Sequence, residues 1–309
     1  MKPPRPFALT RREFVVAAGT AILATPQTAF GATEAVDTSF GAPEDVAIKG
    51  YDGDAMEPFL SRDAKLLLFN NRNTPPEETD LHWAERIDDL TFAYRGRIEG
   101  ANSSALDGVP SMDESGELFF VSTRSYGATF STLYRAQFSK GITTTPVLVE
   151  GVSRREPGWV NFDAEISQDG TLLVFVDSWF GSAGHPLTAE LVLAQRAGDK
   201  FVRRDDSAAL LAAVNGTGLA YAPALSPGGR ELFFTRVEKI APGATPAIYR
   251  AISTGSGVPF GMCARIGALE GFVEAPSLSP DGRLLYFHAK MGDRYRVRLS
   301  RRDRVPAFP

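Results

Sequence analysis

Five segments of this chain repeat one pattern, in which a short strand and a tight turn are followed by an apolar strand. The turns begin at Ser61, Asp113, Ser167, Ser226 and Ser279. Successive copies are therefore 52, 54, 59 and 53 residues apart. Self-similarity at a steady period of this size indicates a repeat architecture, in which every copy folds into the same structural unit.

Each copy predicts a β-hairpin with covered faces. The fifth reads Pro276-Ser-Leu-Ser-Pro-Asp-Gly-Arg-Leu-Leu-Tyr-Phe287. Ser and Asp hydrogen-bond back to their own backbone and Gly supplies positive φ, so Ser-Pro-Asp-Gly forms a turn. The apolar run after it lacks polar alternation, which is typical of a strand buried on both faces. Two weaker strands fit into each remaining interval, and a four-stranded repeat predicts a propeller blade.

The number of copies predicts an all-β, five-bladed propeller in a single domain over residues 45–309. Six blades are the alternative, with a degenerate copy hidden near the 59-residue interval. Only one further strand, Arg294–Arg301, follows the fifth hairpin. We expect residues 45–49 to supply the missing fourth strand, which would close the ring by pairing the two chain ends and leave no open edge.

These hairpins resemble the TolB-type, WD40-like β-propeller repeat, whose hallmark is Pro-x-x-Ser-Pro-Asp-Gly before a short apolar strand ending in Phe. The fifth copy matches throughout and the fourth departs at Gly228. The third lacks the Pro, and the first and second lack the Gly or the Ser-Pro. The resemblance covers residues 45–302. It implies the fold rather than a function, because such propellers bind proteins, glycans or peptides and some are catalysts.

The N-terminus resembles a twin-arginine export signal over Thr10-Arg-Arg-Glu-Phe-Val15, followed by a short apolar stretch. Small residues near Gly31 predict cleavage there, which leaves residues 32–44 as a flexible segment before the propeller. The alternative is a general secretory signal that happens to contain two arginines. The apolar stretch is too short for a permanent anchor. We therefore expect a periplasmic protein that is not inserted in a membrane after cleavage.

Several kinds of chemistry are disfavoured by the sequence. The formal net charge is −4 and the charges are well mixed, without a basic stripe, so a nucleic-acid partner is not expected. Neither a Gly-x-Ser-x-Gly elbow nor a phosphate-binding Gly-rich loop occurs. His82, His185 and His288 lie 21, 18 and 9 residues after their own turn residues, at three different blade positions. This argues against a three-His zinc site, and we expect no metal or other cofactor.

The propeller resemblance implies which residues reach the mouth of the central channel. The innermost strand of each blade begins at one face, and the loop after the second strand returns to it. Glu57, Asp163 and Glu274 then come to the mouth from blades 1, 3 and 5. The other candidate ligand-binding residues of this face are Asn70, Arg72, Arg124, Tyr126, Trp179, Tyr221, Arg236, His288 and Lys290. Carboxylates, guanidinium groups and aromatic rings together suit a polar ligand.

Three interpretations of the mouth remain open. The first is a binding scaffold for an envelope protein, a glycan or a small polar ligand. The second is a carbohydrate-active enzyme, with Glu57, Asp163, Glu274 and His288 as catalytic candidates: one carboxyl would protonate the leaving oxygen while another activates water or attacks. A lyase would use Arg124 with His288. The third is structural, because Arg–carboxylate pairs can join neighbouring blades. The absence of a reactive triad favours a non-catalytic role.

Overall fold

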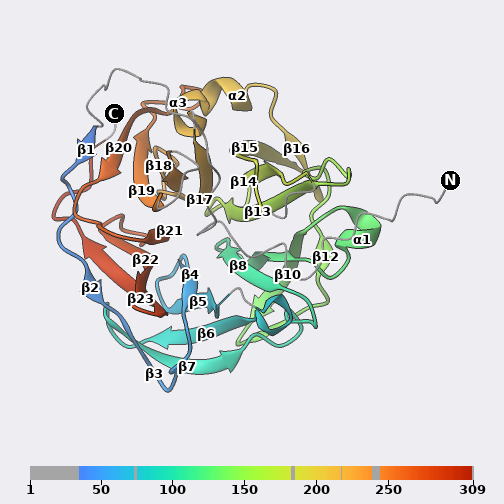
Figure 1. Cartoon of the computed structure of the whole chain (residues 1–309), viewed down its shortest axis with the longest axis horizontal. Helices are drawn as coiled ribbons and strands as arrows, with labels where there is room; N and C mark the ends of the chain where they lie inside the picture. The colour runs from blue at the N-terminus through green and yellow to red at the C-terminus, as the bar shows by residue number, and fades with distance from the viewer. Residues whose placement is uncertain (1–34, 73–74, 182–184, 217, 239–243, 308–309) are drawn as a thin grey trace.

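Five β-sheets surround a common axis, and each sheet contains one sequence repeat (Figure 1). The computed structural model describes residues 35–307, with gaps at 73–74, 182–184, 217 and 239–243. The predicted all-β, five-bladed propeller is confirmed, and the six-bladed alternative is wrong. The expected export signal lies outside the described residues.

Blades 1 to 3 follow the chain in order, and their strands run from the axis outward. Blade 1 contains β4 (Met56–Leu60), β5 (Leu66–Asn70), β6 (Leu81–Arg86) and β7 (Thr91–Arg97). Blade 2 contains β8 (Asp107–Met112), β9 (Glu117–Ser122) and β10 (Leu133–Ser139), with β11 (Ile142–Thr143) and β12 (Val147–Leu148) both paired to β10. Blade 3 contains β13 (Trp159–Ile166), β14 (Leu172–Trp179), β15 (Thr188–Ala197) and β16 (Lys200–Arg203).

Blades 4 and 5 complete the ring. Blade 4 contains β17 (Leu219–Leu225), β18 (Glu231–Val237), β19 (Ala247–Ile252) and β20 (Gly261–Ile266). Blade 5 contains β21 (Val273–Leu278), β22 (Leu284–Met291) and β23 (Arg294–Arg301). The short helices are η1 (Pro76–Glu78), α1 (Tyr126–Thr129), α2 (Ser207–Leu210) and α3 (Ala212–Asn215). Each innermost strand contacts that of the next blade, and β21 contacts β4, so the ring is closed.

The blades are held together by the apolar second strands, as their composition predicts. All seven residues of β18 are buried. Between blades 2 and 3, Phe119 packs with Phe175 and Phe201 in one core cluster. Each such ring contributes about 1.5–3 kcal/mol by its removal from water. The hairpin turn demands positive φ at its last position, which Gly282 adopts at +72° and Ala64 of the first copy at +57°.

The N-terminal segment of the described chain crosses three blades. Strand β2 (Glu44–Asp45) pairs with β23 and supplies the fourth strand of blade 5, which confirms the predicted ring closure. Strand β3 (Ala47–Lys49) was expected in the same blade but pairs in parallel with β7 of blade 1. Strand β1 (Val36–Asp37) pairs in parallel with β20 of blade 4. The propeller therefore starts before residue 45. Strands β1, β2 and β3 lie along blades 4, 5 and 1, across the place where the ring closes.

Buried ion pairs attach both chain ends to blade 4. Arg250 Nη1 lies 2.7 Å from Asp37 Oδ2, and Arg302 Nη2 lies 2.7 Å from Glu231 Oε2. All four side chains are buried. Because a buried charge is stable only with a close partner, this network holds the N-terminal strand and the C-terminal residues in place.

Every innermost strand contains a β-bulge close to the channel mouth. The bulged residues have positive φ: Glu57 (49°), Val109 (56°), Asp163 (46°), Ala222 (48°) and Ala275 (55°). A non-glycine residue in this conformation costs about 1–3 kcal/mol, so the surrounding structure must compensate. Since all five blades share the bulge, it belongs to the architecture of the ring rather than to one site.

The bulge turns a backbone N–H toward the preceding blade, where a side chain accepts its hydrogen bond. Such bonds run from Val109 to Asn70 Oδ1 (2.9 Å), from Ala275 to Thr235 Oγ1 (3.0 Å), from Ala222 to Asp163 Oδ2 (3.0 Å) and from Glu57 to His288 Nδ1 (3.2 Å). These bonds join neighbouring blades near the axis and fix the positions of the mouth residues.

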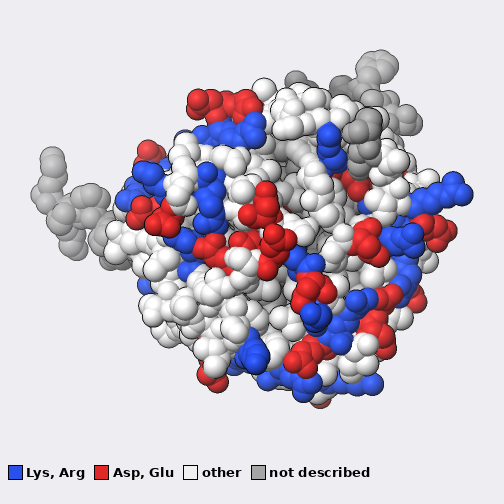
Figure 2. Space-filling model, turned by 180° about the vertical axis from the view of Figure 1, so that it is seen from behind, with Lys and Arg blue, Asp and Glu red and all other residues white. Residues whose placement is uncertain are grey.

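The surface opposite to the view of Figure 1 carries interleaved acidic and basic side chains, with acidic ones gathered near its centre (Figure 2). Within the described part of the chain, no helix has the length and apolar character needed to cross a membrane.

Candidate functional site

Three carboxylates from three blades meet at the channel mouth. Glu57 and Asp163 are the bulge residues of β4 and β13, and Glu274 immediately precedes the bulge of β21. One ligand-forming atom from each of Glu57, Glu274 and His288 lies within 4.8 Å of the others. Asp163 and Glu274 are buried, and although Glu57 is partly exposed as a residue, its Oε2 atom is buried with them.

Two side chains hydrogen-bond to Glu274, and the position of the ring proton of His288 follows from its two partners. The hydroxyl of Tyr221 donates to Glu274 Oε1, and His288 Nε2 lies 3.1 Å from Glu274 Oε2. Because His288 Nδ1 accepts the backbone N–H of Glu57, the ring proton is on Nε2 and points to Glu274. Glu274 therefore accepts hydrogen bonds from two side chains, Tyr221 and His288.

The carboxyl groups of Glu57 and Asp163 are buried with fewer hydrogen-bond donors around them than that of Glu274. Burial, together with the negative charges of Asp163 and Glu274, raises the pKa of Glu57 well above its usual range. Burial raises the pKa of Asp163 to about 7, opposed by the Ala222 N–H bond and reinforced by the charge of Glu274. The Oε2 atom of Glu57 is buried and has no hydrogen-bond partner in the described part of the chain.

The arginines expected at the mouth are paired elsewhere. Arg72 pairs with Asp54 (2.7 Å), Arg124 with Asp107 (2.6 Å) and Arg236 with Glu238 (3.0 Å). Among the described residues, no Arg or Lys forms a salt bridge with the three mouth carboxylates. The expected mixture of carboxylates and guanidinium groups is therefore not what the structure brings together, and Arg–carboxylate pairing does not explain the cluster.

The remaining predicted mouth residues have packing or surface positions. Asn70 accepts one of the blade-joining hydrogen bonds. The hydroxyl of Tyr126 donates to the backbone oxygen of Trp159 (2.9 Å), and Trp179 packs against the Trp159 ring with centroids 5.5 Å apart. Lys290 is exposed on β22. Within the described part of the chain, Tyr221 and His288 hydrogen-bond to the carboxylate cluster through Glu274.

The three histidines do not form a common site. His82 Nδ1 lies 2.8 Å from the hydroxyl of Tyr94, and its ring stacks on Phe69 inside blade 1. Burial, with a smaller effect from the charge of Arg97, lowers the pKa of His82 to about 4. His185 is partly exposed near a gap in the described chain. Only His288 reaches the mouth.

A second charged arrangement, which sequence reasoning missed, lies two residues beyond Asp163 along β13, toward the hairpin turns. Arg62 reaches across from blade 1 and places Nη2 2.9 Å from Glu165 Oε1 of blade 3. The same guanidinium donates through Nε to the Met112 oxygen (3.1 Å), and Ser111 Oγ donates to Glu165 Oε2 (2.7 Å). The available signal was a glutamate within the otherwise apolar start of the third repeat.

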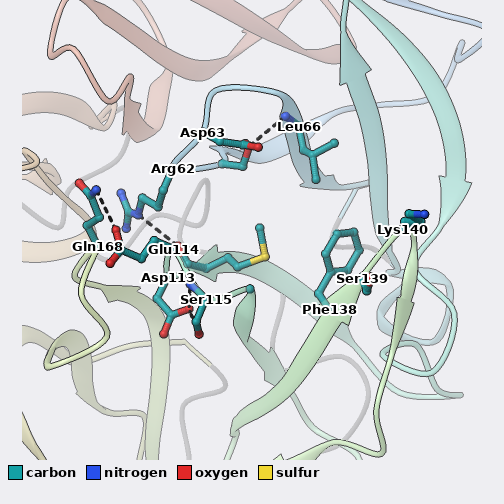
Figure 3. Close-up of a pocket in the computed structure, with 13 residues that line it drawn as sticks. Arg62, Asp63, Leu66, Asp113, Glu114, Ser115, Phe138, Ser139, Lys140 and Gln168 are labelled. Carbon is teal, nitrogen blue, oxygen red and sulfur yellow. Dashed lines mark hydrogen bonds between the residues drawn. The ribbon is translucent and has the colours of Figure 1, made fainter.

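A pocket of about 440 Å³ opens beside this arrangement, among the turns of blades 1 and 2 (Figure 3). Gln168 donates to Glu114 (3.1 Å) at one side, and Phe138 and Lys140 line the other (Figure 3). Asp113 accepts two backbone N–H bonds within its own turn. This carboxylate is therefore satisfied by its turn, in contrast to Glu57 at the mouth.

Comparison with known proteins adds information on the fold. No family model and no curated protein matches the chain. A putative TolB from Agrobacterium tumefaciens is 17% identical over 80% of this chain and 76% of that chain, with a TM-score of 0.49. Zg3597, a family 117 glycoside hydrolase from Zobellia galactanivorans, is 12% identical over 85% and 90%, with a TM-score of 0.58. The catalytic domain of the Coprinopsis cinerea GH62 α-L-arabinofuranosidase is 10% identical over 87% and 98%, at 0.53.

The chain is a five-bladed β-propeller. At identities this low, the likeness to the two glycoside hydrolases is one of fold alone. What the site does must therefore be argued from its own residues.

Proposed function

We propose that this protein is an exported binding propeller that holds its ligand at the channel mouth. The observation that carries the proposal is the convergence of Glu57, Asp163 and Glu274 without an Arg or Lys partner among the described residues. A ligand that supplies positive charge or hydrogen-bond donors would complete this site. Its source would be an envelope protein, a glycan or a small polar molecule, and the twin-arginine-type pattern before residue 31 supports an envelope location.

A purely structural role would not require this cluster. Placing like charges together in a buried setting costs free energy, as the raised pKa values of Glu57 and Asp163 reflect. Hydrophobic residues would pack the mouth at lower cost. Strongly perturbed carboxyl groups in one cluster are typical of functional sites, where stability is sacrificed for binding or chemistry.

The binding proposal is tested with the purified mature protein and its variants. Thermal shift and co-purification with envelope extract and a glycan library should identify a ligand that stabilises the wild type. Glu57→Gln and Glu274→Gln should lose the stabilisation. The control Glu114→Gln, an exposed carboxylate at the opposite end, should keep it. A ligand response that is equal in all four proteins, or no response at all, would contradict the proposal.

A carbohydrate-active enzyme is the second candidate. It is favoured by one specific observation: Glu57, whose pKa is raised, lies beside Glu274, which accepts hydrogen bonds from Tyr221 and His288. Carboxyl groups in such unlike environments can divide the roles of acid and base or nucleophile. Release of reducing ends from arabinan, fructan or pectin fragments by the wild type, abolished in Glu57→Gln and Glu274→Gln, would replace binding by catalysis as the function.

A further inference from the structure

If the mouth binds a ligand, as proposed above, the carboxyl groups of Glu57, Asp163 and Glu274 limit the chemical class of that ligand. The mouth offers acceptors from three directions, because Glu57, Asp163 and Glu274 come from blades 1, 3 and 5. The buried Oε2 atom of Glu57 is an acceptor without a donor in the described chain. A buried acceptor left without a donor is costly, so the group that completes the site should carry N–H or O–H donors.

A positive charge is favoured over a neutral donor. Burial and mutual repulsion disfavour ionisation of Glu57 and Asp163 in the ligand-free protein. A cation within reach of both would reverse that preference and allow them to ionise. The guanidinium groups of Arg72 and Arg124 do not supply this positive charge, because they form ion pairs with Asp54 and Asp107.

The hydrogen bonds of His288 argue against a metal ion as that cation. One atom from each of Glu57, Glu274 and His288 lies within 4.8 Å of the others, a spacing that a divalent ion would also fit. However, His288 Nδ1 already accepts the Glu57 N–H, so Nε2 carries the proton and has no lone pair for a metal. Metal binding at Nε2 would require the ring to lose its bond to the bulge that joins blades 5 and 1.

An alkylammonium group meets the same requirements without disturbing these bonds. Its three N–H donors match three converging carboxylates, whereas the planar fork of a guanidinium matches one carboxylate in bidentate fashion. Asp163 and Glu274 are buried at 7% and 6% exposure, so the charge must reach them on a narrow, unbranched stem. A lysine side chain and a free alkyl diamine both have this form.

We propose that the channel mouth is a binding site for a primary alkylammonium group, held between Glu57, Asp163 and Glu274. His288 and Tyr221 act as positioning residues, because both donate to Glu274 and orient its carboxylate. Binding displaces the proton that the carboxyl groups retain in the free protein, so complex formation releases a proton to the buffer.

Calorimetry on the mature protein tests this assignment at pH 7.5. The ligands are 1,5-diaminopentane and Nα-acetyl-lysine methylamide, which separate a free diamine from a lysine side chain. The Nε-trimethylated lysine derivative, which has the charge but no N–H donor, 1-pentanol, Ca²⁺ and Mn²⁺ serve as comparisons. We expect binding of one or both primary amines, with an enthalpy that depends on the buffer because a proton is released. Glu57→Gln and Glu274→Gln should weaken it on the order of 10- to 100-fold, and Glu114→Gln should not.

Two results would overturn the assignment. The first is binding of Ca²⁺ or Mn²⁺, dependent on Glu57 and Glu274, in place of amines. The second is amine binding that the trimethylated derivative equals or that the two variants do not weaken. If no amine binds but an envelope ligand still depends on Glu57 and Glu274, the ammonium assignment fails and the binding function survives. If no ligand depends on these residues, both fail.

Discussion

Buried carboxylates occur at two neighbouring levels of the innermost strands, at the mouth and toward the hairpin turns (here the turn end), and their partners differ. At the turn end, Glu165 is bonded to the Arg62 guanidinium and to the Ser111 hydroxyl. At the mouth, Glu57 and Asp163 face Glu274 without an Arg or Lys side chain among the described residues, and their pKa values are raised. A carboxylate buried inside this ring can therefore be paired with an arginine, and at the turn end that ion pair joins blades 1 and 3. The contrast indicates that the turn end stabilises the ring and the mouth is kept for a ligand.

The largest effect should come from breaking the pair at the turn end. Arg62→Met leaves Glu165 buried without its charge partner, which should lower the free energy of unfolding by about 3–5 kcal/mol. Urea unfolding followed by tryptophan fluorescence measures this. Arg204→Met, which removes a more exposed pair with Asp206, is the control and should cost about 1 kcal/mol or less. A loss at Arg62 no larger than that of the control would remove the distinction between the two ends.

The blade-joining bonds beside the mouth should show an intermediate effect. Thr235→Val keeps the side-chain shape but leaves the buried Ala275 N–H without its acceptor, so the free energy of unfolding should fall by about 1–2 kcal/mol. Thr171→Val at an exposed turn should change it by about 0.5 kcal/mol or less. Ligand binding at the mouth should persist in both variants. Equal stabilities of the two variants would mean that the bonds do not hold the blades together.

A smaller effect of pH should distinguish the mouth from the rest of the molecule. Asp163 has a folded-state pKa of about 7, above its ordinary value of 3.8, so its favourable contribution is lost as pH rises through 7. His82 has the opposite sign: its pKa of about 4 lies below 6.5, so stability is lost as pH falls from 6.5 toward 4. Between pH 6.5 and 8 the carboxyl effect exceeds what remains of the histidine effect, and unfolding should become easier by about 0.5 kcal/mol.

Asp163→Asn isolates that contribution, because the asparagine oxygen can still accept the Ala222 N–H bond. The difference between pH 6.5 and 8 in urea unfolding should shrink in this variant. It should become slightly larger in His82→Asn, in which stability should also fall as pH rises from 4 to 6.5, because the histidine no longer opposes the effect of Asp163. A wild-type protein that gains stability from pH 6.5 to 8 would show that the mouth carboxyls are compensated in a way absent from this account.

Repeat spacing and turn chemistry predicted the ring, its blade number and its closure by an N-terminal strand, although that strand is Glu44–Asp45 and not residues 45–49. They also predicted the shared end of Glu57, Asp163 and Glu274. These features follow from strand periodicity, which is local in sequence. The partners of Arg72 and Arg124 were not predictable. A long side chain can reach several carboxylates, and which of them lies nearby is decided by the packing of the folded chain. Positive φ at Val109 carried no sequence signal, since a β-branched residue is among the least expected there. The Arg62–Glu165 pair joins blades 103 residues apart in sequence, which no local pattern encodes.

The free energy of unfolding of Glu57→Gln at pH 8, compared with that of the wild type, tests the central claim most directly. If the mouth is held in an unfavourable state for a ligand, the neutral amide relieves repulsion from Asp163 and Glu274 and supplies N–H donors. The variant should then be more stable by about 1 kcal/mol while losing the ligand. A variant that is clearly less stable than the wild type would show that Glu57 supports the fold, and the account of the mouth as a binding site would be contradicted.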